Sequence, residues 1–254
     1  MDAVNRDRRI AGAGTPAEAW RNDAALAGVP AIDPAGLLGT ASRVVVVAPH
    51  PDDEILSCGG LLAQYGGPLL LVAVTDGEGS HPGSPAWPVD RLRGTRPQES
   101  LAALRSLGIA APAFLRLGIA DGGVSAAEGM LCARLQGIIG PADLVITTWR
   151  YDGHPDHEAT ARACAAAATR CGARLLEVPV WGWHWSAPGD GAMPLASARR
   201  LDLDAAIVAR KRAAMLCFDS QLAVDESTGA APILPGHALE RALQPFELYL
   251  HGHP

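Results

Sequence analysis

The stretch VVVVAPHPDDE, residues 44–54, decides which fold this chain can adopt. Four consecutive valines indicate a β-strand that is buried on both faces, as the parallel strands of α/β proteins are. The strand runs directly into a histidine, a proline and three acidic residues, after which residues 53–65 have helical spacing. This order predicts a strand, a turn and a helix, with a dense group of charges at the turn.

The alternation of strands and helices continues along the chain. We expect strands at residues 43–49, 68–76, 113–117, 143–149 and 174–181, and helices at 53–65, 96–108, 126–140, 158–172 and 203–218. Such alternation favours an α/β fold with one Rossmann-like, mostly parallel and doubly wound sheet and with helices on both faces. Ligands of these sheets bind beyond the carboxyl ends of the strands.

Composition excludes several classes of partner. The net charge of −6 argues against nucleic acid or anionic lipid, which are bound mainly by clustered lysine and arginine. No apolar run is long enough to span a bilayer, and the N-terminus lacks the apolar segment of a signal peptide. Five scattered cysteines without a Cys-x-x-Cys pair indicate free thiols in a reducing compartment. We therefore expect a cytoplasmic protein, and a homo-oligomer is compatible with the sequence.

Two segments combine histidine with aspartate at the ends of predicted strands. His50 and Asp53 are three residues apart where one helix begins, and His154 and His157 repeat this spacing after the strand at 143–149. The carboxyl ends of parallel strands meet at one edge of a sheet, so both segments can contribute metal ligands to one point. Two histidines and one carboxylate leave open positions on a zinc ion, as in catalytic zinc sites.

Another interpretation of these segments involves no metal. Acidic residues complement the positive end of a helix, and a histidine can cap it, so residues 50–54 are also typical of an ordinary helix start. A nucleotide-binding oxidoreductase is disfavoured because the first turn has no glycine-rich phosphate cradle. The occurrence of both segments together favours the metal site.

The motifs PHPDDE (residues 49–54) and HPDH (residues 154–157) resemble those of the PIG-L/LmbE-type zinc N-deacetylases. These enzymes remove acetyl groups from N-acetylglucosamine-containing and related molecules, and the resemblance extends over residues 43–222. It implies one zinc ion per chain, with another divalent ion such as Fe²⁺ as an alternative. The implied zinc ligands are His50, Asp53 and His157, and the implied general base is Asp52.

The resemblance also implies a second group of roles near the metal. His154 would stabilise the tetrahedral oxyanion or protonate the departing amine, and Asp156 would orient and charge His154. Arg96 and Asp121 would contact sugar hydroxyls. For Glu99 we expect a salt bridge at the start of a helix.

Segments outside these motifs are assigned more coarsely. FDSQL, residues 218–222, resembles a family segment in which Ser220 and Gln221 are interpreted as structural. Residues 76–95 and 181–194, rich in glycine and proline, are predicted to be long loops at the rim of the site. The tryptophans of WGWHW, residues 181–185, either pack on a sugar ring or alternate between two faces as a strand.

These observations predict a single deacetylase domain over residues 1–254. A polar N-terminal extension covers residues 1–42, the catalytic core residues 43–222, and a C-terminal tail, residues 223–254, packs on the core. The predicted function is zinc-dependent hydrolysis of an N-acetyl or short N-acyl amide on an N-acetylglucosamine-type sugar or its conjugate, with metal-activated water and an aspartate base. The alternatives are an inactive metal- or sugar-binding homologue and a non-haem iron oxygenase with two histidines and one carboxylate.

Overall fold

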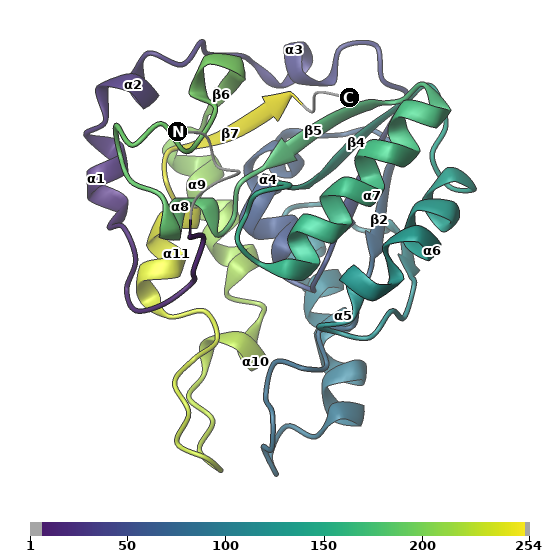
Figure 1. Ribbon diagram of the computed structural model, residues 1–254, viewed down its shortest axis with the longest axis vertical. Helices are drawn as coiled ribbons and strands as arrows, with labels where there is room; N and C mark the ends of the chain where they lie inside the picture. Colours follow the sequence, from purple (N-terminus) through teal and green to yellow (C-terminus); the bar gives the residue numbers. More distant parts are fainter. Residues whose placement is uncertain (1–6, 252–254) are drawn as a thin grey trace.

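The computed structural model describes residues 7–251 and confirms the α/β fold with one mostly parallel sheet. Within these residues the sheet has seven strands in the order β3-β2-β1-β4-β5-β7-β6 (Figure 1). The strands are β1 (Arg43–Ala48), β2 (Leu69–Ala73), β3 (Ala113–Arg116), β4 (Asp143–Thr148), β5 (Arg174–Val178), β6 (Ala198–Asp202) and β7 (Phe246–His251). β1 to β5 are parallel to one another, whereas β7 is antiparallel to both β5 and β6.

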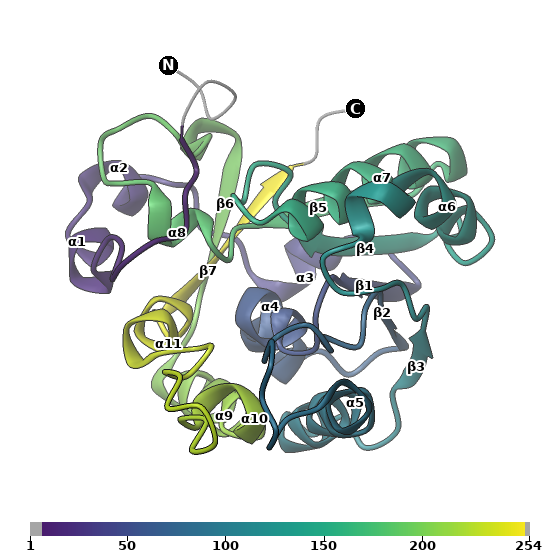
Figure 2. The same cartoon turned by 60° about the horizontal axis from the view of Figure 1, so that its bottom comes forward.

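Helices cover both faces of the sheet. The longer ones are α4 (Asp53–Gln64), α5 (Val89–Ser106), α6 (Val124–Gln136), α7 (Pro155–Cys171) and α9 (Ala205–Met215). The shorter ones are α1 (Ala17–Arg21), α2 (Ala24–Ala27), α3 (Pro34–Leu38), α8 (Gly182–Trp185), α10 (Asp219–Leu222) and α11 (Gly236–Ala242). Figure 2 shows α6 and α7 on one side of the sheet and α4, α5 and α9 on the other. No described helix is long and apolar enough to cross a membrane.

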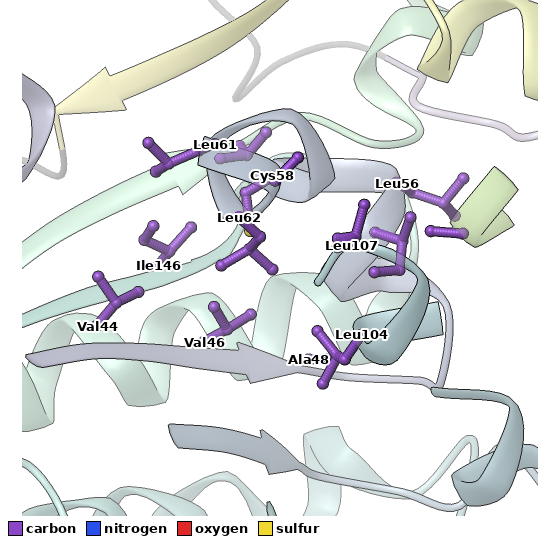
Figure 3. Close-up of a cluster of buried hydrophobic side chains, with 14 of the residues drawn as sticks. Val44, Val46, Ala48, Leu56, Cys58, Leu61, Leu62, Leu104, Leu107 and Ile146 are labelled. Carbon is purple, nitrogen blue, oxygen red and sulfur yellow. The ribbon is translucent and has the colours of Figure 1, made fainter. Parts of the chain in front are cut away.

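The valines of β1 explain why this strand lies at the centre of the sheet. Val45 and Val47 belong to the apolar cluster beneath α6 and α7, whereas Val44 and Val46 point to the opposite face. There they pack against α4, as Figure 3 shows with Leu61 and Leu62 of that helix. Alternate side chains of a strand point to opposite faces, so a run of four valines buries itself in two layers at once.

Helix α5 begins seven residues before the predicted start at residue 96, so the expected loop at 76–95 is shorter than predicted. The sequence pattern placed Pro97 in the first helical turn, but it lies inside α5. A proline has no N–H to donate to the carbonyl four residues earlier. That carbonyl, of Arg93, accepts a hydrogen bond from Arg116 Nη2 of β3 at 3.0 Å instead. This contact between distant residues offsets the cost of the internal proline, and local sequence did not reveal it.

The chain after residue 222 is more than a tail packed on the core. β7 inserts between β5 and β6, and the sequence pattern had predicted neither of the last two strands. The described part of the N-terminal extension packs against this end of the sheet, where Trp20 donates its indole N–H to the carbonyl of Trp183 at 2.9 Å. At the β7–β6 end of the sheet, the C-terminal segment therefore contributes a strand, and the N-terminal segment packs against it.

The aromatic segment at residues 181–185 contains a short helix, so the alternative of an alternating strand does not hold. It forms the short helix α8, in which Trp183 is buried against the edge of Trp20, with ring centroids 5.2 Å apart. Trp185 stacks on Trp149, with ring planes 10° apart. Trp181 alone of the three lines the cavity described below.

Strand order places the two histidine-containing segments next to each other. β1 lies between β2 and β4, so the ends of β1 and β4 are adjacent although about a hundred residues separate them in the chain. The chain leaves these strands towards opposite faces, through α4 and α7. Such a switch point forms a crevice at the carboxyl edge of the sheet.

Candidate metal centre

The first segment, residues 50–53, joins β1 to α4 through a strained turn. α4 begins at Asp53, and Asp52 before it has φ of 128°, the one positive φ at a non-glycine residue in the described chain. This conformation costs about 1–3 kcal/mol and is found where surrounding structure enforces it, often at functional sites. The strain separates the two neighbouring carboxylates, since Asp53 lies in the helix and Asp52 does not.

The second segment, residues 154–157, follows β4 and a short polar turn. α7 begins at Pro155, which suits a first helical position because its missing N–H has no partner there in any helix. His154 is the N-cap residue, and its Nδ1 accepts a hydrogen bond from the backbone N–H of Asp156 at 3.3 Å. His157 lies in the first turn of the helix and is buried.

Three atoms of the predicted ligands form a nearly equilateral triangle. His50 Nδ1 lies 3.3 Å from His157 Nε2 and 3.3 Å from Asp53 Oδ2, and the last two atoms are 3.2 Å apart. Neighbouring ligands of a tetrahedral zinc ion, at metal–nitrogen distances of about 2.0–2.1 Å, are about 3.3–3.4 Å apart. The donor set and its spacing therefore fit a small divalent cation. His154 is also close enough to the two other histidines to join such a group.

Asp152 supports His157 and was missed by the sequence analysis. Its Oδ2 lies 2.8 Å from His157 Nδ1, so the imidazole carries its proton on Nδ1 and leaves Nε2 free to bind a metal. The same fully buried carboxylate accepts hydrogen bonds from three successive backbone N–H groups at residues 180–182. An aspartate five residues before His157 carries no recognisable spacing, because its role depends on the loop after β5.

His50 is supported on its other side by two carboxylates. Its Nε2 lies 3.1 Å from Asp121 Oδ1 and 3.4 Å from Asp156 Oδ2. These acids favour a proton on Nε2, which leaves Nδ1 available as a metal ligand. Asp121 also accepts a hydrogen bond from the backbone N–H of Gly79 at 2.9 Å. It was predicted to contact sugar hydroxyls, but it lies against a predicted metal ligand and also lines the cavity.

The hydrogen-bond partners of the Asp156 carboxylate in the described residues are backbone N–H groups of another segment, and not the His154 ring with which it was predicted to pair. The carboxylate accepts hydrogen bonds from the backbone N–H groups of Gly122 and Val124 at 2.7 and 3.2 Å, and it faces His50. Asp156 is the second residue of α7. It therefore connects His50 to the turn at residues 120–123.

The surroundings of His154 favour the neutral imidazole over the expected cation. Burial and the charges on His157 and His50 lower the pKa of His154 to about 3. Since Nδ1 accepts from a backbone N–H, the remaining proton of the neutral ring is on Nε2. An imidazole N–H at the cavity wall can still stabilise negative charge.

Proton affinities at the triangle indicate a site for positive charge. Burial alone would lower the pKa of His157, but the carboxylates of Asp53 and Asp152 raise it to about 9. Burial likewise opposes the charged form of Asp53, yet His157 and His50 hold the pKa of its carboxyl well below the usual range. Two imidazoles and a carboxylate placed this closely are stabilised by a cation between them, whether protons or a metal ion.

The guanidinium of Arg96 forms an ion pair with the Asp52 carboxylate. Arg96 Nη2 donates to Asp52 Oδ2 at 3.0 Å and to the carbonyl of Pro51 at 2.7 Å, and Nη1 donates to the carbonyl of Gly77 at 2.7 Å. Burial raises the pKa of Asp52 to about 8, against the lowering effect of Arg96. Arg96 was predicted to contact sugar hydroxyls, but most of its donors are bound by the protein.

Glu99 likewise differs from its prediction, because it lies within α5 and not at a helix start. Its carboxylate accepts hydrogen bonds from the backbone N–H and the hydroxyl of Ser220, at 2.8 and 2.6 Å. The predicted salt bridge of Glu99 is not present among residues 7–251.

A cavity of about 180 Å³ contains both the triangle and Asp52. One wall is polar and includes Asp121, Arg96 and the loop at Gly79. The apolar part of its lining includes Leu56, Trp181 and Leu234. The size suits one sugar ring or a group of similar bulk, and the two kinds of wall suit a ligand with both hydroxyl groups and C–H faces.

Comparison with known proteins supports the family resemblance. Residues 45–168 match the family model described as PIG-L, GlcNAc-PI de-N-acetylase, so the resemblance predicted from the two segments is confirmed over this range. A 1D-myo-inositol 2-acetamido-2-deoxy-alpha-D-glucopyranoside deacetylase of Rhodococcus erythropolis is 34% identical over 180 residues, which cover 60% of each chain. The chain matches 52–61% of the length of the first five such relatives.

Two solved structures with this fold are of deacetylase from teicoplanin biosynthesis. The deacetylase–bog complex has a TM-score of 0.63 at 21% identity and matches 82% of this chain and 96% of its own. The zinc-inhibited form of teicoplanin deacetylase Orf2 has a TM-score of 0.60 at 21% identity, over 82% and 97% of the two chains. At this level of identity the likeness establishes the fold.

Proposed function

We propose that this chain, whose residues 45–168 match the PIG-L family, is a metal-dependent hydrolase that removes an N-acetyl or short N-acyl group from an N-acetylglucosamine-type sugar or its conjugate. One observation carries the proposal. The ligand atoms of His50, Asp53 and His157 lie 3.2–3.3 Å from one another, and Asp52 lines the same cavity. The name of the Rhodococcus erythropolis relative, a deacetylase of an acetamido sugar, supports the substrate class.

The proposed cofactor is one zinc ion per chain, held by His50 Nδ1, Asp53 Oδ2 and His157 Nε2. When bound, such an ion polarises an amide carbonyl and lowers the pKa of water to near 7. Asp152 and Asp121 would hold the two imidazoles in the required tautomers. Iron(II) accepts the same ligands and is the alternative occupant.

Asp52 is the proposed general base. It is buried in the cavity wall and turned away from Asp53 by its positive φ, so it need not bind the metal. The burial that raises its pKa to about 8 makes it able to hold a proton near neutral pH. Asp52 would take a proton from the attacking water and return it to the amine nitrogen as the C–N bond breaks, leaving a carboxylic acid and a free amine.

His154 is the proposed donor to the developing oxyanion. Its Nδ1 is occupied by the N-cap hydrogen bond, so Nε2 carries the proton. A fixed N–H directed at developing negative charge stabilises the transition state more than the neutral amide. This role does not require His154 to be cationic and is compatible with its low pKa.

The test begins with metal-free protein prepared with a chelator and reloaded with zinc or iron(II). We expect acetate and free amine to appear in equal amounts from at least one member of a panel of N-acetylated amino sugars, glycosides and glycoconjugates. Zinc should be titrated through excess, because one similar structure is a zinc-inhibited form. Bound metal without acetate release from any substrate would favour a binding protein, and oxygen consumption with iron(II) would favour an oxygenase.

We further propose that residues 1–254 act as one domain and that the protein works in the cytoplasm. The contact of Trp20 with Trp183 and the insertion of β7 into the sheet support the first point. The five unpaired cysteines, typical of reducing compartments, support the second.

A further inference from the structure

Three side chains between α5 and α10 fix the orientation of one amide group. Glu99 accepts the hydroxyl hydrogen of Ser220 at 2.6 Å, and Gln221 Nε2 lies 2.9 Å from the same hydroxyl oxygen. Because the Ser220 hydrogen is given to Glu99, its oxygen is left as an acceptor, and only the N–H₂ side of the Gln221 amide can face it. The reversed amide would bring two acceptors together. The carbonyl oxygen of Gln221 is therefore directed to the other side.

This carbonyl oxygen is buried and unsatisfied. Gln221 is fully buried, and its Oε1 has no hydrogen-bond partner among residues 7–251. Gln221 lines the same cavity as the metal triangle and Asp52. A buried carbonyl without a partner is costly to a folded protein, so each example requires an explanation. Here the explanation is a ligand group with a hydrogen to donate.

A second unsatisfied atom of opposite character belongs to another residue of the cavity lining. Arg96 is 2% exposed, and its Nε is buried without a partner in the described chain, whereas its Nη atoms are bound by the protein. Arg96 and Glu99 are three residues apart on α5 and so share one face of the helix. Two residues of the cavity lining thus carry one unsatisfied N–H donor and one unsatisfied carbonyl acceptor.

This pair of atoms selects the class of ligand. A hydroxyl group both donates and accepts hydrogen bonds, so the hydroxyls of a sugar can satisfy both atoms. A carboxylate or phosphate has no hydrogen for Gln221 Oε1 and would be repelled by it. The geometry is that of a polyhydroxyl recognition site beside the proposed metal, and not of a site for an anionic group.

We propose that Gln221 is a substrate-recognition residue whose Oε1 accepts a hydrogen bond from a hydroxyl group of the bound amino sugar, with Ser220 and Glu99 as positioning residues that hold its amide. The proposal rests on the proposed function and adds to it a contact that discriminates between sugars. It replaces the sequence-based interpretation of Ser220 and Gln221 as purely structural.

The test compares substrates that lack single hydroxyls. Methyl N-acetylglucosaminide and its 3-deoxy, 4-deoxy and 6-deoxy analogues are assayed for kcat/KM with wild-type protein and Gln221→Met. We expect one deoxy analogue to be about 5- to 100-fold poorer than the parent with wild type, since it leaves the buried acceptor unpaired. With Gln221→Met the parent should fall to the level of that analogue, and the difference between the two substrates should disappear.

Gln244→Met is the matched control. Gln244 is also buried with both amide atoms unpartnered in the described chain, but it does not line this cavity. This variant should keep the wild-type pattern across the deoxy series. If Gln221→Met does not fold, Gln221→Asn, which retracts the carbonyl by one methylene, should weaken discrimination against the same analogue.

Ser220→Ala tests the positioning role. It frees the Gln221 amide to rotate, so discrimination against the same analogue should shrink, and Ser220→Thr, which keeps the hydroxyl, should restore it. A folded Ser220→Ala protein with unchanged discrimination would overturn the positioning role.

The outcomes separate this proposal from the proposed function. If wild type is active and every deoxy effect persists in Gln221→Met, the recognition role of Gln221 is overturned and the deacetylase proposal stands. If wild type neither hydrolyses nor, by calorimetry, binds any N-acetylated sugar, both proposals are overturned together.

Discussion

The first and second segments begin with the same three residues, His-Pro-Asp, but the fold uses them differently. In the first segment the helix begins at the fourth residue, so the third residue, Asp52, remains outside it with a strained φ. In the second segment the helix begins at the second residue, so the third, Asp156, is already in a helical turn. Where the helix begins therefore decides which way the shared aspartate points.

Because of this difference, the two segments supply different groups to the site. Asp52 faces the cavity and Arg96, whereas Asp156 faces the turn after Asp121 and supports His50. The first histidine offers a ligand atom to the triangle, whereas His154 caps its helix. One segment supplies two proposed ligands and the base, and the other supplies one ligand and a donor. A shared motif does not imply shared roles.

The largest expected effect separates the two histidines of the second segment. His157→Ala should lose the metal, with a fall in affinity greater than the roughly 10- to 100-fold typical of residues that only support a ligand. His154→Ala should keep the metal and lower kcat by about 10²- to 10³-fold, because a donor to the oxyanion is lost. Metal content after dialysis and acetate release measure the two effects. Metal loss in His154→Ala and retention in His157→Ala would reverse the assignment.

Next in size is the contrast between the two aspartates at the third position. Asp52→Asn should lower kcat by about 10²- to 10⁴-fold with metal still bound, because the amide cannot accept the proton. Asp156→Asn is the matched control and should act mainly on metal affinity through His50, with a much smaller change in kcat. Single-turnover rates with metal-saturated protein distinguish the two. Equal rates for Asp52→Asn and wild type would defeat the proposed mechanism.

A smaller contrast concerns the carboxylates that support the two imidazoles. Asp152→Ala should weaken metal binding by about 10- to 100-fold and lower the Tm, since three backbone N–H groups also lose their acceptor. Asp121→Ala should weaken metal binding less, because Asp121 is partly exposed and Asp156 also supports His50. Competitive chelation measures both affinities. A larger effect for Asp121→Ala would show that the first segment depends more on its supporting acid.

The smallest expected effect comes from a substitution at Gly77 that displaces Arg96, which contacts Asp52 of the first segment. A Cβ at Gly77 would collide with the Arg96 guanidinium, whereas a Cβ at Gly83 meets nothing within 4 Å, and both glycines have positive φ. Alanine at either position should cost about 1–2 kcal/mol of backbone strain. Only Gly77→Ala should also lower kcat, by roughly 10- to 100-fold, through displacement of Arg96 from Asp52. Equal kcat values in the two variants would disconnect Arg96 from the activity.

Much of the fold was readable in the sequence, because strand and helix periodicity are local properties. The five parallel strands and the helices between them lie within a few residues of their predicted positions. The start of α5 was misplaced, since the bond from Arg116 that tolerates Pro97 comes from another strand. β6 and β7 were missed because their pairing joins the end of the chain to segments about fifty residues earlier.

The sequence by itself determined that histidines and carboxylates follow two buried strands, and that these strands belong to one parallel sheet. Only the tertiary structure decided which atoms meet, because His50 and His157 are 107 positions apart and their contact depends on the order of strands. It also supplied Asp152, the pairing of Asp156 with His50, and the orientation of Gln221. These contacts join residues through the folded chain, and residue spacing alone does not encode them.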